Sequence, residues 1–271
     1  MDALRAIGVS LRRACFLTGI TVRGYHYIPL GEEANKELME RIRDIAKRFP
    51  RWGLPRIFDA LRFAGEKVNR KRVHRLYRIN KLQLQYRRKA RRLRTSTQPL
   101  PVPDRPNRIW ALDFMHDALY TGRKIRFLNI VDACTRECLD IETDYGFSGD
   151  RVARVLDVLL ITRGTPEIIM SDNGPEFQSS AVMRWAARNR VHWHFIDPGK
   201  PNQNAWIESF NGKFRDECLN LHAFSCLEET KEIVMQWKEE YNTVRPHSSL
   251  GRIPPVAYAV RFKQQKLQLQ V

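Results

Sequence analysis

Three acidic residues occupy the positions in this chain that are best suited to chemistry. Asp113 interrupts the apolar run from Ile109 to Phe114, and Asp172 follows the apolar run from Ile168 to Met170 and precedes an Asn-Gly pair. A carboxylate at the carboxyl end of a buried strand, before a turn, lies where open sheets carry catalytic groups. The third acid, Glu208, follows Asp172 after 35 intervening residues, 173 to 207. Three carboxylates can hold a pair of divalent cations, because hard cations prefer oxygen ligands.

A pair of Mg²⁺ ions about 3.5–4 Å apart can activate an attacking oxygen and stabilise the leaving oxygen of a phosphodiester. We assign Asp113 as the ligand that bridges both ions, with Asp172 on one and Glu208 on the other, and Mn²⁺ as the alternative ion. Asp132, which also ends a predicted strand, is the main alternative to Asp113. We interpret Asp132 instead as hydrogen-bonded to the turn at Thr135 and Arg136.

The acids lie within a longer series of motifs. Trp110 precedes the first Asp, and Asp-Asn-Gly is found at the second; Pro198–Asn204 precedes Glu208, and Tyr241–Gly251 follows it. In these residues the chain resembles the catalytic core shared by retroviral integrases and DDE transposases. It is similar in particular to the OrfB product of bacterial insertion sequences whose transposase is made from two overlapping reading frames. The resemblance covers about residues 10 to 260.

The resemblance implies a ribonuclease H-like fold and a DNA transposase that acts in two steps. Water cleaves an element end and frees a 3′-OH, and the 3′-OH then attacks a second phosphodiester, first at the element's own ends and later in target DNA. It also implies a homo-oligomer on element ends and target DNA, and an upstream partner, the OrfA product or an OrfAB fusion. The sequence leaves two alternatives open: an integrase or nuclease of another mobile element, and a non-catalytic DNA-binding regulator of transposition.

The positive charge of the chain is concentrated in its first part. Residues 1–105 contain 26 Lys and Arg against 9 Asp and Glu, a net charge of +17, whereas residues 106–271 contain 21 of each. A basic segment joined to a neutral body predicts a module that grips a polyanion beside a body with another task.

Residues 1–80 are predicted to form a helical DNA-binding region, with a helix-turn-helix at about 54–80. Helices are expected at 34–49 and 55–64, and Asn69 is expected to cap a third helix that ends at Ile79. Residues 81–105 form a basic, Pro-rich linker that can follow a phosphate backbone. The predicted DNA contacts in these two regions are Arg70, Lys71, Arg72, Arg75, Arg87, Arg88, Arg91 and Arg92.

From residue 106 the pattern becomes α/β. Strands are expected at 109–115, 125–131, 137–142, 167–171 and 191–196, with helices at about 150–162 and 179–189 between the later strands. This order fits a ribonuclease H-like mixed sheet over 106–225. A helix at about 227–242 follows within a C-terminal region, 226–271, that packs on the core, and we expect a frayed tail from Lys263 to Val271.

The helix that carries Glu208 places Asn211 and Arg215 on the same face, at i+3 and i+7. We predict that both contact DNA, as do Lys200 and Gln203 in the preceding loop. The alternative for Arg215 is an ion pair with a neighbouring acid.

Other site classes are disfavoured. Five scattered cysteines argue against a disulfide framework. Cys218, His222 and Cys226 have a zinc-like spacing but supply only three ligands, so we do not predict zinc. His192 and His194 are expected to be structural. No apolar run reaches membrane-spanning length and the N-terminus lacks a secretory pattern, which favours the bacterial cytoplasm, at the nucleoid, and no membrane partner.

Overall fold

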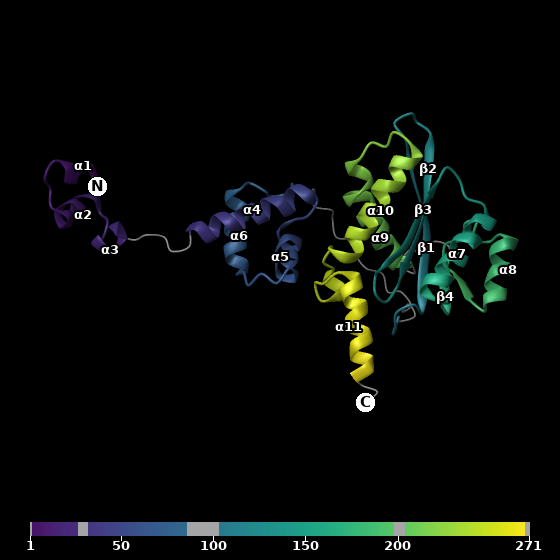
Figure 1. Cartoon of the computed structure of the whole chain (residues 1–271). Helices are drawn as coiled ribbons and strands as arrows, with labels where there is room; N and C mark the ends of the chain where they lie inside the picture. Colours follow the sequence, from purple (N-terminus) through teal and green to yellow (C-terminus); the bar gives the residue numbers. More distant parts are fainter. Residues whose placement is uncertain (1, 27–31, 86–102, 198–203, 269–271) are drawn as a thin grey trace.

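The computed structural model describes residues 2–26, 32–85, 103–197 and 204–268. Its centre is a five-stranded mixed sheet in the order β3-β2-β1-β4-β5 (Figure 1). The strands are β1 (Ile109–Ala118), β2 (Lys124–Asp132), β3 (Cys138–Asp144), β4 (Ile168–Ser171) and β5 (His192–Phe195). β1, β2 and β3 form an antiparallel meander, whereas β4 pairs in parallel with both β1 and β5. This is the predicted order of three meandering strands followed by alternating helices and strands.

Helices cover both faces of the sheet because successive side chains of a strand point to opposite sides. Trp110 and Leu112 pack beneath α7 (Gly149–Arg163) and α8 (Ser180–Asn189). Ala111 and Met115, which alternate with them, pack beneath α9 (Ala205–Glu217) and α10 (Leu227–Thr243). Figure 1 shows these two helical layers on opposite sides of the strands. The odd-numbered residues of β1, from Ile109 to Asp117, therefore point toward the face of the sheet that α9 covers.

The N-terminal part contains two groups of helices. The first comprises α1 (Asp2–Ala6), α2 (Leu11–Thr18) and α3 (Val22–Tyr25). The second comprises α4 (Glu32–Arg48), α5 (Leu54–Phe63) and α6 (Arg70–Ile79) around an apolar core that includes Ile42, Ile57 and Val73. The side chain of Asn69 accepts a hydrogen bond from the backbone N–H of Lys71, which confirms the predicted cap.

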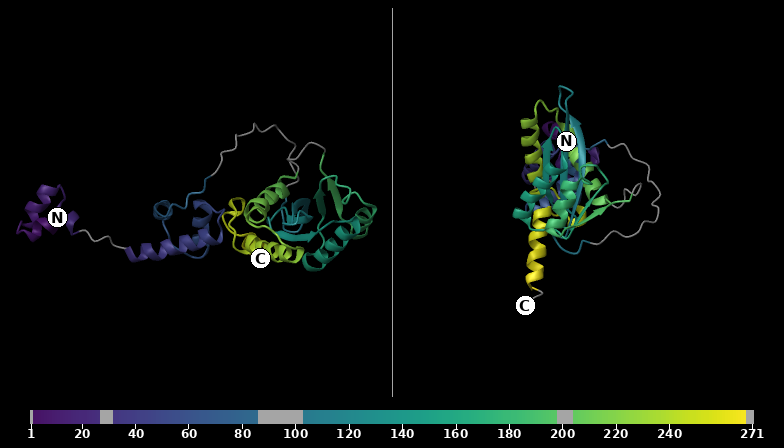
Figure 2. Two further views of the ribbon diagram at one scale, coloured as in Figure 1. Left: turned by 90° about the horizontal axis from the view of Figure 1, so that it is seen from above. Right: turned by 90° about the vertical axis from the view of Figure 1, so that its right-hand side faces the viewer.

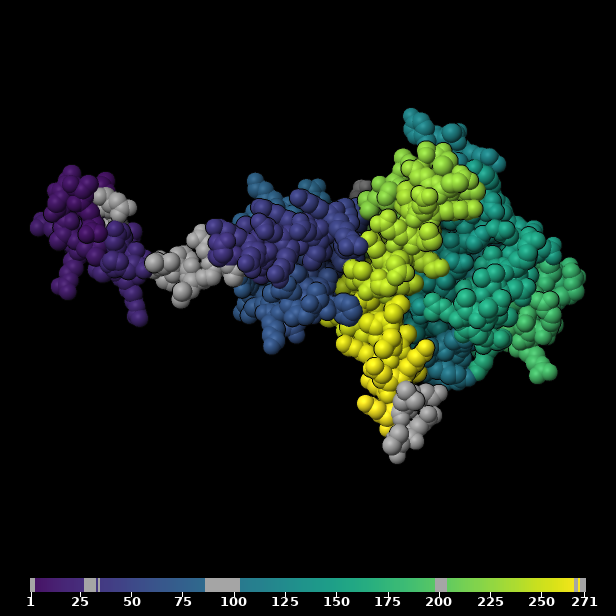
Figure 3. Space-filling view, in the orientation of Figure 1, coloured from purple at the N-terminus to yellow at the C-terminus, as the bar shows by residue number. Residues whose placement is uncertain are grey.

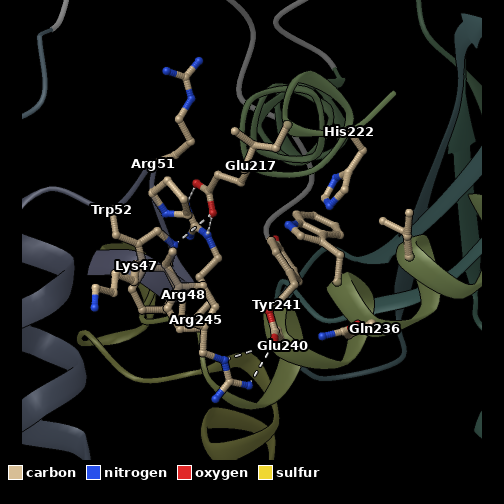
Figure 4. Close-up of a pocket in the computed structure, with 15 residues that line it drawn as sticks. Lys47, Arg48, Arg51, Trp52, Glu217, His222, Gln236, Glu240, Tyr241 and Arg245 are labelled. Carbon is tan, nitrogen blue, oxygen red and sulfur yellow. Dashed lines mark hydrogen bonds and ion pairs between the residues drawn. The ribbon is translucent and has the colours of Figure 1, made fainter. Parts of the chain in front are cut away.

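The α4–α6 group lies against one end of the core. The space-filling view in Figure 3 shows its surface meeting α10 and the C-terminal residues. The contact is centred on Glu217, the last residue of α9, whose carboxylate receives two hydrogen bonds from Arg245, at 2.6 and 2.7 Å. Arg56 and the indole N–H of Trp52, from the α4–α6 group, bind the same carboxylate at 3.1 and 3.3 Å. Figure 4 shows Arg245 and Trp52 converging on Glu217 at one wall of a cavity between the two parts.

The C-terminal tail differs from the prediction. Residues Pro255–Gln268 form a helix, α11, so the expectation of a frayed tail from Lys263 is wrong up to Gln268. Figures 1 and 2 show α11 projecting away from the core. The end of α11 is exposed and polar, so its sequence has only a weak apolar periodicity. Gln and Lys, which have high helix propensity, favour the helix there.

Two glycines provide a matched test of the packing. Gly149, at the start of α7, lies so close to the N-terminus of α8 that an added Cβ would stand 2.5 Å from the Cβ of Ser179. Gly212, inside α9, has open space where its Cβ would be. We expect Gly149→Ala to lower the free energy of unfolding by about 1–3 kcal/mol. We expect Gly212→Ala to raise it by about 0.5–1 kcal/mol. Urea denaturation of both variants measures the difference, and equal effects would contradict the close approach of α7 and α8.

Candidate active site at the carboxyl edge of the sheet

The parallel pairing of β1 with β4 places two of the predicted acids side by side. Ala111 pairs with Met170, so the same register carried forward by two residues sets Asp113 beside Asp172. Neighbouring strands lie about 4.8 Å apart. Asp172 directly follows the last residue of β4, as predicted from the sequence, whereas Asp113 lies in the middle of β1, two residues beyond the end of the parallel ladder.

Asp113 faces α9 and is held there by hydrogen bonds. Its carboxylate accepts the backbone N–H of Phe114 at 2.8 Å and the side-chain amide of Asn211 at 2.6 Å. The amide oxygen of Asn211 in turn accepts from the amide of Asn129 at 2.7 Å. Asn129 is fully buried and pairs with Asp113 across β1 and β2. The two amides therefore form a chain, Asn129 to Asn211 to Asp113, that fixes one carboxylate oxygen.

Asp172 lies in a turn that is tied to the neighbouring strand. Its carboxylate accepts the backbone N–H of Gly174 at 3.1 Å, and an added Cβ at Gly174 would stand 3.1 Å from that oxygen. The amide of Asn173 donates to the carbonyl of Ile196 at 3.0 Å, just beyond β5. The Asp-Asn-Gly sequence therefore orients the carboxylate through an Asx turn, for which Gly174 leaves room.

Glu208 lies in the first turn of α9 with an exposed side chain, and no described residue hydrogen-bonds its carboxylate. Arg215, two turns further along the same face, binds Asp117 of β1 at 2.7 Å and also donates to the carbonyl of His116. This is the ion pair with a neighbouring acid that the sequence left open as the alternative for Arg215. Arg215 and Asn211 both bind residues of β1 and so hold α9 on that strand. Because Glu208 belongs to α9, these contacts also fix where its backbone lies over the sheet.

The electrostatics of Asp113 show that its neighbours add negative charge. The pKa of Asp113 is raised to about 6, mainly by burial and also by the charges of Asp172 and Glu208, against the hydrogen bonds from Phe114 and Asn211, which lower it. Burial also raises the pKa of Glu208. Three carboxylates that repel one another at a partly buried site are stabilised by a cation.

The donor set fits hard divalent ions, although the side chains are not gathered into a finished metal site. Among the described residues no three His, Cys, Asp or Glu side chains lie together closely enough to bind one ion. Asp113 and Asp172 are brought together by the strands, and Glu208 lies within electrostatic reach of Asp113. The Glu208 side chain is exposed and has no described hydrogen-bond partner, so no such bond holds it in its present rotamer.

The alternative acid, Asp132, has a structural role. One oxygen accepts the backbone N–H groups of Cys134 and Thr135 at 2.7 and 2.8 Å, and the other accepts that of Asn107. Asp132 pairs with Trp110, toward the opposite end of β1 from Asp113. The interpretation of Asp132 as a turn-stabilising residue is therefore confirmed. Cys218 is buried, and its carbonyl oxygen lies 2.9 Å from Nδ1 of His222.

The predicted DNA contacts fall into three groups. Arg70, Lys71 and Arg75 are exposed on α6, whereas Arg72 donates to Asn35 of α4 at 2.8 Å. Asn211 and Arg215 are engaged within the core as described above. The remaining predicted contacts lie outside the described residues: Arg87, Arg88, Arg91, Arg92, Lys200 and Gln203. All of these DNA contacts stay predictions.

Comparison with known proteins agrees with this arrangement. Two models described as integrase core domain match residues 103–201 and 189–255, and a model described as HTH-like domain matches residues 33–90. The chain is 42% identical to the insertion element IS476 uncharacterized 39.2 kDa protein of Xanthomonas euvesicatoria, over 95% of this chain and 75% of that protein. It is 40% identical to the insertion element IS407 uncharacterized 31.7 kDa protein of Burkholderia multivorans, over 97% of this chain and 95% of that protein.

A solved structure shows the same fold. The simian T-cell lymphotropic virus intasome, determined in complex with the PP2A regulatory subunit B56 gamma, contains a chain similar to this one with a TM-score of 0.53 and 12% identity. The match covers 71% of this chain and 67% of that chain. The predicted ribonuclease H-like fold, with a helix-turn-helix-like domain before it, is therefore confirmed. Within the described residues no helix has both the length and the apolar character needed to cross a bilayer.

The raised pKa of Asp113 predicts a stability that depends on pH. In the metal-free protein this acid is protonated more readily when folded than when unfolded, so its charge destabilises the fold as the pH rises from about 4 through about 6. Asp113→Asn keeps an acceptor for Asn211 and removes the charge. We expect this variant to gain at most about 3 kcal/mol at pH 7.5 in EDTA, from about two pKa units at about 1.4 kcal/mol each. The gain should vanish at and below pH 4.

Glu217→Gln serves as the control with the opposite sign. Burial would raise the pKa of Glu217, but the bonds from Arg245, Arg56 and Trp52 outweigh it and lower the pKa. Its charge therefore stabilises the fold above its unfolded pKa, and this contribution is lost as the pH falls. We expect Glu217→Gln to be less stable than the unsubstituted protein at pH 7.5, with a difference that shrinks in acid. Urea denaturation across this pH range checks both trends, and parallel trends for the two variants would contradict the assigned environments.

Proposed function

Because this chain belongs to the integrase-core family of insertion-element transposases, we propose that it cleaves DNA strands and transfers 3′-OH ends in a metal-dependent reaction. The observation that carries the proposal is the register of β1 and β4, which sets Asp113 beside Asp172 under the helix that bears Glu208. Asp113, Asp172 and Glu208 would hold two Mg²⁺ ions, or Mn²⁺ in their place, with Asp113 as the shared ligand. When bound, these ions activate the attacking oxygen and stabilise the leaving oxygen.

The protein's own contribution is to position the carboxylates of Asp113 and Asp172 before DNA arrives. Asn211 holds one oxygen of Asp113, and the N–H of Gly174 holds Asp172. Asn129 is fully buried, and its hydrogen bond to the amide oxygen of Asn211 leaves the amide nitrogen of Asn211 directed toward Asp113. The attacking group is water in the first step and the DNA 3′-OH in the second, so no side chain acts as a nucleophile. Preorganised ligands of this kind reduce the reorganisation needed to reach the transition state.

The basic N-terminal part supplies the DNA contacts of this proposal. Residues 1–105 carry the whole net charge of +17, and the exposed residues Arg70, Lys71 and Arg75 of α6 form a basic helix in the HTH-like unit. We propose that the unit binds element ends and that the protein acts as a homo-oligomer with an upstream OrfA product or as part of an OrfAB fusion. The site of action would be the bacterial cytoplasm, at the nucleoid.

An in vitro joining assay tests the proposal with a matched pair of glutamates. Glu208 and Glu228 are both exposed and both lie in the first turn of a helix, but Glu228 belongs to α10, away from Asp113. The purified protein, with and without its upstream partner, is incubated with Mg²⁺ and duplexes that carry element ends. Glu208→Gln should lower the yield of joined DNA by more than about 100-fold, since even losing a group that only supports a metal ligand costs about 10–100-fold. Glu228→Gln should not change the yield.

The same assay separates the alternatives. A nuclease of another mobile element would release a 3′-OH end and never join it to a second strand. A non-catalytic regulator would bind the duplexes and produce neither product. Joining that is unaffected by Glu208→Gln would contradict the proposed role of the three acids.

A further inference from the structure

A basic cavity lies on the flank of α9 opposite the candidate active site. It has a volume of about 210 Å³, and its polar wall includes Arg136, Ser209, Lys213, His247 and Ser249. At 3.6 residues per turn, Ala205, Ser209 and Lys213 share one side of α9, whereas Glu208, Asn211 and Arg215 share another. The cavity is therefore separate from the proposed metal ligands, although it is built on the same helix. A single water needs about 15 Å³ of such space, so this cavity is large enough for a phosphate group.

Two side-chain nitrogens in this wall, a donor on Arg136 and a ring nitrogen of His247 that donates in one tautomer, have no hydrogen-bond partner among the described residues. Nη1 of Arg136 and Nε2 of His247 are buried, and no described residue hydrogen-bonds to either. His247 is 4% exposed. A buried polar group without a partner is unfavourable by about 1–3 kcal/mol, so native proteins rarely leave one without a reason. Among the described residues, the cavity wall contains no acidic residue that could neutralise Arg136 or Lys213.

The surrounding structure holds both donors in place. Arg136 has a positive φ of 60°, its backbone N–H donates to Asp132, and its guanidinium lies 5.6 Å from the ring of Trp206. The backbone N–H of His247 donates to Ile253 at 3.1 Å, and its ring meets that of Tyr241 edge to face at 4.8 Å. The donors are therefore preorganised.

The electrostatics agree with a site that awaits negative charge. The pKa of His247 is lowered to about 2, mainly by burial and also by the charges of Arg245, Lys213, Arg56 and Arg136. Burial and the charge of Arg245 likewise lower the pKa of Lys213 to about 8. Nζ of Lys213 donates to the carbonyl and hydroxyl oxygens of Ser209, both neutral acceptors. Arg245 and Arg56 are paired with Glu217, whereas no described carboxylate forms an ion pair with Arg136 or Lys213, so the charges of these last two side chains are left unpaired.

The cavity continues toward the HTH-like unit. A neighbouring cavity of about 530 Å³ shares Ser209, Lys213, His247 and Ser249 with it and extends to Pro55 and Arg56 of α5. Arg245 and Arg252 also line the neighbouring cavity; its acidic residue, Asp59, is paired with Arg252 at 3.1 Å. A basic path therefore leads from the flank of α9 to the proposed DNA-binding helices. An extended polyanion suits such a path better than a small free anion.

The motif Tyr241–Gly251 gains a role from this arrangement. Asn242 binds the backbone of Cys138 in β3 through two hydrogen bonds of 2.8 Å, and Arg245 binds Glu217. These contacts anchor the segment to the sheet and to α9, and His247 then projects into the cavity wall. The proposed metal site uses none of these three residues.

We propose that Arg136, Lys213 and His247 form a binding site for a phosphodiester group of DNA, on the side of α9 that faces away from the metal ligands. The identity of the anion as DNA rests on the proposed function. The site positions a DNA strand between the HTH-like unit and the catalytic helix, and it takes no part in the chemical step.

The salt dependence of DNA binding tests this site directly. Binding of the full chain to a fluorescein-labelled random-sequence duplex is measured by anisotropy in EDTA, where no cleavage is needed. Loss of one phosphate contact should reduce the slope of log Kobs against log salt by about 0.9. We expect this reduction, and about tenfold weaker binding at low salt, for Arg136→Gln. Arg136→Lys, which keeps the charge, should largely restore the slope.

Arg154→Gln is the matched control, because Arg154 is exposed on α7, across the sheet from the cavity. It should leave the slope unchanged, and equal slopes for Arg136→Gln and Arg154→Gln would overturn the site. Thermal unfolding serves as the check on folding. Removal of an uncompensated cation should leave the melting temperature of Arg136→Gln unchanged or raise it. A melting temperature well below that of the unsubstituted protein, with an unchanged slope, would mark Arg136 as purely structural and overturn the proposal.

The imidazole signals of His247 in the NMR spectrum identify the source of the phosphate. Duplex DNA should shift the Nε2 signal. Millimolar inorganic phosphate or a nucleoside monophosphate should not bring that shift to saturation. Saturation by the free anions, with no response to DNA, would overturn the assignment to DNA. These measurements are independent of the joining assay: a protein that never joins DNA yet shows the slope change loses the proposed function and keeps the site. A protein that joins DNA while the two slopes are equal keeps the function and loses the site.

Discussion

The parallel pairing of β1 with β4 is the constraint on which the rest of the site depends. It is a short ladder of three residue pairs, Ile109–Ile168 to Ala111–Met170, and it brings together two acids that are 59 residues apart in the chain. A register shift by one residue would turn Asp113 from the face under α9 to the face under α7. Tight apolar packing on both faces, by Trp110 and Leu112 on one side and Ala111 on the other, makes such a shift unfavourable.

Helix α9 joins the separate parts of the molecule. One flank carries Glu208 above the sheet, the opposite flank lines the basic cavity, and the last residue, Glu217, binds the α4–α6 group. The buried face of α9, with Ile207, Phe210 and Phe214, fixes the helix on β1 and β2. The α4–α6 group therefore binds the same helix that carries Glu208, the third acid. Arg245 holds the Glu217 carboxylate in place on the core side, and Arg56 and Trp52 bind it from the α4–α6 group, so these contacts join the two parts.

Local patterns in the sequence predicted the elements, and long-range contacts were beyond its reach. Alternation and apolar runs located the strands, and Asn69 and the Asp-Asn-Gly turn acted as their residue types predict. Asn129 carried a readable signal, because it interrupts an apolar strand as Asp113 does, but its partner Asn211 lies 82 residues away. Likewise the sequence offered both an ion pair and DNA as partners for Arg215, and only the fold brings Asp117 to it. Arg136 and His247 became candidates only when burial left their donors without partners.

Crystallography of the protein with Mn²⁺ tests the central claim most directly, because anomalous scattering locates the ion without reference to activity. The account predicts anomalous peaks between Asp113 and Asp172, with the side chain of Glu208 turned toward them and the amide of Asn211 still on Asp113. In crystals of Asp113→Asn these peaks should be lost. Manganese bound elsewhere, or absent from the carboxyl edge of β1 and β4 at saturating concentration, would contradict the account.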